Sequence, residues 1–98
     1  MEGHSLISPE VLASYAADAA RETAGVAGLV ESSLHRHKGV RVAEQEGRVS
    51  VELHLAAEWG TSLPDVGRAV QRRVVEYLAR MADVRPDAVN VVFDEIVP

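Results

Sequence analysis

Three histidines would form the most specific chemical site in this sequence if their side chains met. His35 and His37 stand two residues apart in a basic segment, and His54 follows in an alternating stretch. Zinc in proteins needs three or four convergent nitrogen, oxygen or sulfur ligands. This spacing matches no closed zinc motif, and Arg36 and Lys38 beside the pair repel cations. The pattern therefore favours a solvated turn, and we predict no bound metal and no other cofactor.

The second candidate is the Gly-Val-Ala-Gly motif from Gly25 to Gly28. KH domains clamp a nucleic-acid backbone with a GxxG loop between two helices. Here the motif follows a predicted helix, precedes a predicted strand, and is flanked by Glu22 and Glu31. The favoured interpretation is a turn that ends the helix, with Gly25 in the left-handed conformation. A KH-like nucleic-acid-binding module remains the alternative.

Basic side chains are concentrated on the second predicted helix. Arg68, Arg72 and Arg80 are separated by multiples of four residues, and Arg73 adjoins them. A solvated helix face is the simplest interpretation, because Glu76 interrupts the row and can pair with Arg80 at i+4. In an acidic protein, however, this concentration of cations is also the best candidate for a docking surface. We therefore predict a partner-binding patch of Arg68, Arg72, Arg73 and Arg80.

The carboxylates do not suggest a catalytic pair. Asp94 and Glu95 are adjacent in a predicted strand, so their side chains point to opposite faces and do not converge on one substrate atom. Glu44 and Glu46 fall in a predicted hairpin loop. The sequence contains no nucleophile–base pairing and no phosphate-binding loop. We predict that the protein is not an enzyme.

Length and composition predict one small domain over residues 1–98. The chain has no cysteine, which excludes disulfides and thiolate metal sites. Its net charge of −5 argues against general affinity for nucleic acids or anionic membranes. No apolar run approaches the roughly 20 residues that span a bilayer. The segment that starts at Met1 lacks a basic secretory n-region, so we expect a cytoplasmic protein without direct membrane insertion.

Two stretches define the elements that must hold these residues. Residues 48–58 alternate, with Val49, Val51, Leu53 and Leu55 on one face, as in a half-buried strand. Ser62 is the predicted N-cap of a helix that continues to residue 82. Its apolar face follows the i, i+3, i+4, i+7 pattern and consists of Leu63, Val66, Val70, Val74, Tyr77, Leu78 and Met81.

The remaining elements complete an α+β pattern. Ser8 and Pro9 predict the start of an alanine-rich helix. Residues 26–34 predict an irregular or edge strand, residues 40–43 a strand antiparallel to residues 48–58, and the alternation over residues 89–94 a final strand. The order α-(β)-β-β-α-β predicts a two-layer sandwich, with two helices on one face of a three- to four-stranded mixed sheet. The last strand can run parallel to a strand before the second helix.

An ordered set of short motifs resembles the alkaline shock protein family, the envelope stress response proteins of Gram-positive bacteria. The resemblance covers residues 6–97, and its strongest marker is Trp59-Gly60-Thr61-Ser62-Leu63-Pro64-Asp65-Val66. One departure is Asp83, where the family usually has glycine. Asp tolerates the left-handed conformation better than most residues, at some cost. The motif residues predicted to be structural are Gly25, Gly28, Trp59, Gly60, Ser62, Pro64, Gln71 and Asn90.

The resemblance implies a non-enzymatic cytoplasmic protein of the envelope stress response. It would act by self-association and by docking to a membrane-bound anchor or partner protein, and so reach the membrane indirectly. The Arg patch and the free sheet edge at residues 26–34 are the predicted docking surfaces. A scaffold domain that forms rings or filaments is a further alternative.

Overall fold

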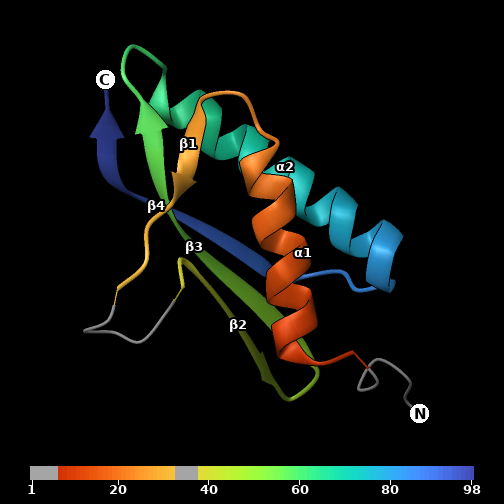
Figure 1. The fold of residues 1–98 in the computed structure, drawn as a ribbon. Coiled ribbons are helices and arrows are strands. Elements are labelled where there is room, and N and C mark those ends of the chain that lie inside the picture. The colour runs from red at the N-terminus through yellow and green to blue at the C-terminus, as the bar shows by residue number, and fades with distance from the viewer. Residues whose placement is uncertain (1–6, 33–37) are drawn as a thin grey trace.

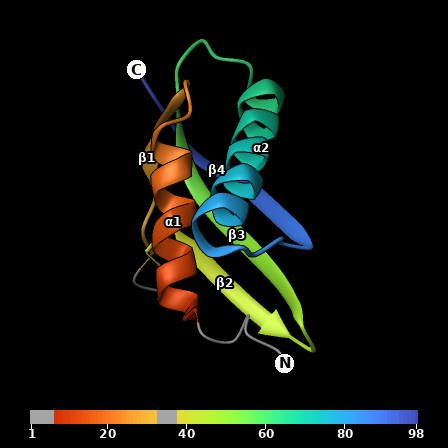
Figure 2. The ribbon, with the colours of Figure 1, turned by 90° about the vertical axis from the view of Figure 1, so that its right-hand side faces the viewer.

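A computed structural model describes residues 7–32 and 38–98, which form two layers. Figures 1 and 2 show both helices on the same face of the sheet. The predicted α+β sandwich is confirmed. The elements, in chain order, are α1 (Pro9–Arg21), β1 (Val26–Leu29), β2 (Val40–Gln45), β3 (Arg48–Glu58), α2 (Leu63–Ala82) and β4 (Ala88–Val97).

The first helix starts where the sequence predicts and ends earlier. The Ser8 hydroxyl accepts a 3.2 Å hydrogen bond from the Val11 N–H, which is an N-cap. The prediction that Gly25 ends the helix is wrong, because the cap residue is Glu22 in the right-handed conformation. Thr23 is buried and donates its hydroxyl to the Ala19 carbonyl at 2.9 Å. The turn into β1 then requires a positive φ, which Gly25 supplies at +94°.

Strand β3 is the centre of the sheet. It pairs antiparallel with β1 and β2 and parallel with β4, which confirms the predicted mixed sheet. The His54 N–H bonds to the Gly39 carbonyl at 2.7 Å, and the Val30 N–H bonds to the His54 carbonyl at 2.8 Å. Both backbone groups of one strand residue point to the same side. Strands β1 and β2 therefore lie in line along one edge of β3, and β4 lies along the other.

Two strand boundaries need correction. Strand β2 extends to Gln45, so Glu44 lies in the strand rather than in the hairpin loop. The turn is only Glu46 and Gly47, both with positive φ, which is typical of a tight two-residue hairpin. The irregular strand expected at residues 26–34 is shorter, and its register shifts between Val26 and Gly28.

The core lies between β3 and the helices. Val51, Leu53 and Leu55 are completely buried, and they face Val70, Val74 and Leu78 of α2 within one cluster. Alanines of α1 complete it, and Ala16 and Ala20 are also fully buried. Small side chains allow this helix to approach the sheet closely.

The end of α2 confirms one expectation and corrects another. Asp83 adopts the left-handed conformation, with φ 54° and ψ 37°. The Asp83 N–H bonds to the Ala79 carbonyl at 3.1 Å, which is the single bond of an αL cap, and the Val84 N–H bonds to the Leu78 carbonyl at 3.2 Å. Val84 is buried, whereas Met81 is 46% exposed, so the prediction of Met81 on the buried face is wrong. The chain reversal at Asp83 brings Val84 into the core.

Candidate partner-binding site

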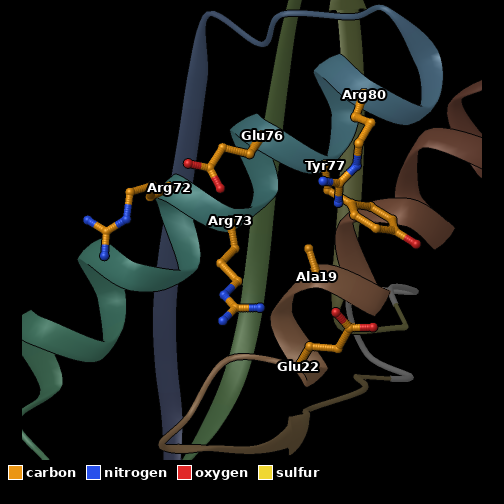
Figure 3. A pocket seen from close by; sticks show the side chains of 7 residues that line it. All are labelled: Ala19, Glu22, Arg72, Arg73, Glu76, Tyr77 and Arg80. Carbon is orange, nitrogen blue, oxygen red and sulfur yellow. The ribbon is translucent and has the colours of Figure 1, made fainter.

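A basic groove lies between α1 and α2. It has a volume of about 360 Å³. We call it the arginine groove; Figure 3 shows its lining residues Ala19 and Glu22 from α1, and Arg72, Arg73, Glu76, Tyr77 and Arg80 from α2. It is the place where most of the predicted Arg patch comes together.

Helical spacing positions the side chains of this groove. Arg73, Tyr77 and Arg80 are four and three residues apart, so they share one side of α2. The ring of Tyr77 packs edge-on against Tyr15 of α1, with centroids 5.9 Å apart and an interplanar angle of 76°. The Arg80 guanidinium lies 5.6 Å from the centroid of the Tyr77 ring, within the range of a cation–π contact. These aromatic contacts hold one wall of the groove in place.

The groove carries a positive charge in an acidic protein. Three guanidinium groups line it, against the carboxylates of Glu22 and Glu76. Arg73 extends toward α1, where Glu22 lies (Figure 3). The planar guanidinium matches the geometry of a carboxylate and can bind it through two parallel hydrogen bonds. The arrangement suits acidic side chains of a partner.

The structure divides the predicted Arg patch. Arg68 lies outside the arginine groove, where it forms an ion pair with Asp65. It lines a different groove, between α2 and β4. The predicted patch rested on spacing within α2 alone, and this spacing does not show where α1 packs against α2. For that reason Glu22 and Tyr77 were not in the predicted patch. The one sequence feature that could have indicated their place in the groove was the prediction that α1 and α2 share one face of the sheet.

The GxxG motif does not form a loop between helices. Gly25 occupies the turn before β1, and Gly28 lies within β1 opposite Ala56. A Cβ at Gly25 would lie 2.6 Å from Val66 Cγ2, so this turn packs closely on α2. The motif is placed to join α1 to the sheet, which is not the geometry of a KH domain.

The corner between β3 and α2 contains four of the motif residues. Gly60 makes the turn with φ +90°, and the Ser62 hydroxyl caps α2 by accepting a 3.4 Å hydrogen bond from the Asp65 N–H. Pro64 lies in the first turn of α2. The Trp59 N–H bonds to the Val97 carbonyl at 2.8 Å, but its side chain is 76% exposed. The backbone of this corner is structural, whereas the indole faces solvent.

The last two motif residues lie at β4. The Gln71 amide of α2 donates a 2.9 Å hydrogen bond to the Val89 carbonyl and so links the helix to this strand. Asn90 is exposed and lies opposite Glu52 of β3.

A charged triad that the sequence did not predict lies on the sheet face away from the helices. His54 Nδ1 is 2.8 Å from Asp94 Oδ2, and His54 Nε2 is 2.6 Å from Glu52 Oε2. Burial lowers the pKa of His54, but the hydrogen bonds and charges of the two carboxylates outweigh it and raise the pKa above 6.5. The pairing of β3 with β4 brings Asp94 to His54 across 40 residues of sequence.

The histidines weighed as metal ligands, His35 and His37, lie outside the described residues. Within residues 7–32 and 38–98, the metal-ligating side chains form no group of three that could hold an ion. In the same part of the chain, neither helix combines the length and the apolar character needed to cross a bilayer.

Comparison with known proteins gives a family and a fold. The model of the alkaline shock protein family, described as having a cell envelope-related function, matches residues 1–98. An uncharacterised protein of Bacillus subtilis (strain 168), YqhY, is 28% identical in an alignment of length 95, and the match covers 87% of this chain and 70% of YqhY.

Solved structures of MamM CTD share the fold. A variant in its manganese form is 16% identical with a TM-score of 0.65, covering 88% of this chain and 96% of that chain. A second MamM CTD structure is 15% identical with a TM-score of 0.63 and the same coverage.

Proposed function

The chain belongs to the alkaline shock protein family, whose function is related to the cell envelope, and we propose that it serves there as a non-enzymatic docking protein in the cytoplasm. It would associate with itself and bind a membrane-anchored partner protein, and so be held at the membrane indirectly. The partner would contribute an acidic segment to the arginine groove. The envelope stress response is the setting that we propose for this activity.

The observation that carries the proposal is the arginine groove. Arg72, Arg73 and Arg80 gather in one hollow of a chain whose net charge is −5. A wall of packed tyrosines fixes the position of Arg80, so one guanidinium is held in place before a partner arrives. A preorganised cation loses less conformational entropy on binding than a freely moving one.

The proposal is tested by reversing the groove charges in Arg72→Glu/Arg73→Glu. We expect the wild type to capture a membrane protein from detergent-solubilised membranes of the source cells and the double variant to lose that capture. The charge-matched control is Arg48→Glu/Arg85→Glu, which changes two exposed arginines, one of β3 and one of the segment between α2 and β4, and keeps the groove intact.

Self-association is measured by light scattering of the purified protein, and we expect a mass above that of the monomer. Electron microscopy separates closed oligomers from rings or filaments. A strict monomer at high micromolar concentration, together with no captured membrane protein, would overturn the proposal.

A further inference from the structure

Strand β4 has a long free edge. Among the described residues it pairs with β3 alone, along residues 88–97. An unpaired edge offers its N–H and C=O groups to another strand, and natural proteins usually block such edges. Here a bulge at Asp94, where the register with β3 shifts, interrupts the edge near its carboxyl end.

The register shows which backbone groups of β4 point outward. His54 bonds to Gly39 and Val30, so its neighbours Leu53 and Leu55 bond to β4. In a parallel pair, the residue opposite a bonded residue directs its own N–H and C=O away. Leu53 lies opposite Val91, and Leu55 lies opposite Phe93. Val91 and Phe93 therefore present their backbone groups to the free edge.

The side chain of Gln71 supports the outward direction of these backbone groups. Val89 is two residues before Val91, so its carbonyl also points outward, and this carbonyl accepts the 2.9 Å hydrogen bond from Gln71. The protein therefore satisfies one edge carbonyl with its own side chain. The groups of Val91 and Phe93 follow directly after it along the strand.

A shallow, open apolar groove runs beside this edge. It has a volume of about 320 Å³ and lies between α2 and β4, lined by Leu63, Pro64, Gly67, Arg68, Gln71, Val91 and Phe93. A Cβ at Gly67 would meet only Phe93 Cε2, at an ordinary 3.6 Å. Alanine would therefore fit, and it would stabilise the helix by about 1 kcal/mol relative to glycine. Glycine leaves the hollow above Phe93 open.

Charge decides what kind of strand fits. Asp87, Asp94 and Glu95 lie near the two ends of the edge, and β4 contains no cation. One oxygen of Asp87 accepts the Val49 N–H and one oxygen of Asp94 contacts His54, so each of these carboxylates has a second oxygen outside that contact. Arg68 at the rim of the groove is already paired with Asp65. An added strand with Lys or Arg at its ends would therefore find opposite charges at both ends of β4.

A second copy of β4 does not fit as well. The symmetric antiparallel register that would use Val89, Val91 and Phe93 together places Glu95 opposite Asp87 of the other copy, at both ends. Like charges directly opposite each other destabilise a strand pair. The edge thus disfavours pairing with itself.

We propose that β4 and α2 form an acceptor site for an extended, basic segment of another protein, which adds as a fifth strand beside β4. Its backbone bonds to Val91 and Phe93, as in β-strand addition. An apolar side chain of the segment fills the hollow over Gly67. This acceptor site prefers a basic segment, whereas the arginine groove is proposed to bind an acidic one. The inference therefore does not depend on the docking proposed for the arginine groove.

The test uses a fluorescein-labelled peptide, Lys-Val-Thr-Val-Thr-Val-Lys, and its twin with Glu at both ends. By fluorescence anisotropy we expect the Lys peptide to bind and the Glu twin to bind at least about tenfold more weakly. Methylation of alternate backbone nitrogens of the Lys peptide should weaken binding by a similar factor, because it removes the main-chain donors.

Variants of the protein locate the site. Gly67→Leu fills the hollow and should weaken binding of the Lys peptide about tenfold, whereas Gly67→Ala, which fits without a clash, should keep the fold and weaken it less. Arg72→Glu/Arg73→Glu lies in the other groove and should leave binding within about twofold. In amide hydrogen exchange, the bound peptide should slow Val91 and Phe93.

Three results would overturn the inference. The first is equal binding of the Lys peptide and the Glu twin. The second is new exchange protection along Val40–Gln45 instead of at Val91 and Phe93, which would place the added strand on the other edge of the sheet. The third is protection of Val91 and Phe93 by self-association alone, which would make a second copy of the chain the occupant.

Discussion

The two faces of the sheet differ sharply along a single strand. On the covered face of β3, Val51, Leu53 and Leu55 are fully buried beneath the helices. On the open face, Glu52 and His54 alternate with them, and His54 is bonded to carboxylates on both ring nitrogens. One face is held by apolar burial and the other by charge, although the residues are neighbours in sequence.

The two faces should therefore differ in how much they stabilise the fold and in how strongly that stabilisation depends on pH and salt. Burial of a leucine side chain stabilises the fold by about 1.5–3 kcal/mol, with little dependence on pH near neutrality. An exposed or half-exposed ion pair contributes about 0–1 kcal/mol and responds to pH and salt. We therefore expect variants of the covered face to change the free energy of unfolding itself. Variants of the open face should change how that free energy depends on pH.

The largest effect is expected from Leu53→Ala on the covered face. The variant removes a fully buried side chain and leaves a cavity, which should lower the free energy of unfolding by about 2–5 kcal/mol. Urea denaturation followed by circular dichroism measures it. The control is Ser50→Ala on the open face of the same strand, which we expect to change stability by less than about 0.5 kcal/mol. Equal effects of the two changes would remove the distinction between the faces.

A smaller effect is expected from Gly25→Ala, at the turn that closes the covered face. The residue has φ +94°, and an added Cβ would lie 2.6 Å from Val66 Cγ2. Backbone strain and this clash should lower stability by about 1–3 kcal/mol. The control Gly28→Ala has ordinary φ and no heavy atom within 4 Å of the added Cβ, so its effect should stay within about 1 kcal/mol. Thermal melting of both variants checks the difference.

The smallest effect, and the one specific to the open face, concerns pH. Because the folded pKa of His54 is raised, protonation of His54 stabilises the fold fully below its unfolded pKa of about 6.5. This contribution is lost as the pH rises through the folded pKa. We expect unfolding free energies of the wild type to fall over that interval and those of His54→Gln to stay flat by comparison. An unchanged pH dependence in His54→Gln would show that other groups are responsible.

Much of the fold could be predicted because its signals are local. Alternation from Arg48 to Glu58 gave the bounds of β3, and the Ser8 and Ser62 caps marked both helix starts. Asp83 was expected in the left-handed conformation because family relatives usually have glycine there. The end of α1 was misplaced, since the carbonyls of its last turn are satisfied by Glu22 and Thr23 before the chain reaches Gly25.

The candidate sites were predicted only in part. The predicted patch contains Arg72, Arg73 and Arg80, which do line one groove, but it also includes Arg68, which lines another groove. The contribution of Glu22 depends on the position of α1 beside α2. No pattern within one element contains that information.

The sequence by itself determined the order of helices and strands, the single layer of helices and the family resemblance, because periodicity, caps and motifs are encoded over a few residues. Only the tertiary structure decided which side chains meet. Asp94 reaches His54, and Gln71 reaches Val89, because β4 lies parallel to β3 beneath α2. Such contacts depend on register and packing between distant segments, where a shift of one residue would turn each side chain to the other face of the sheet.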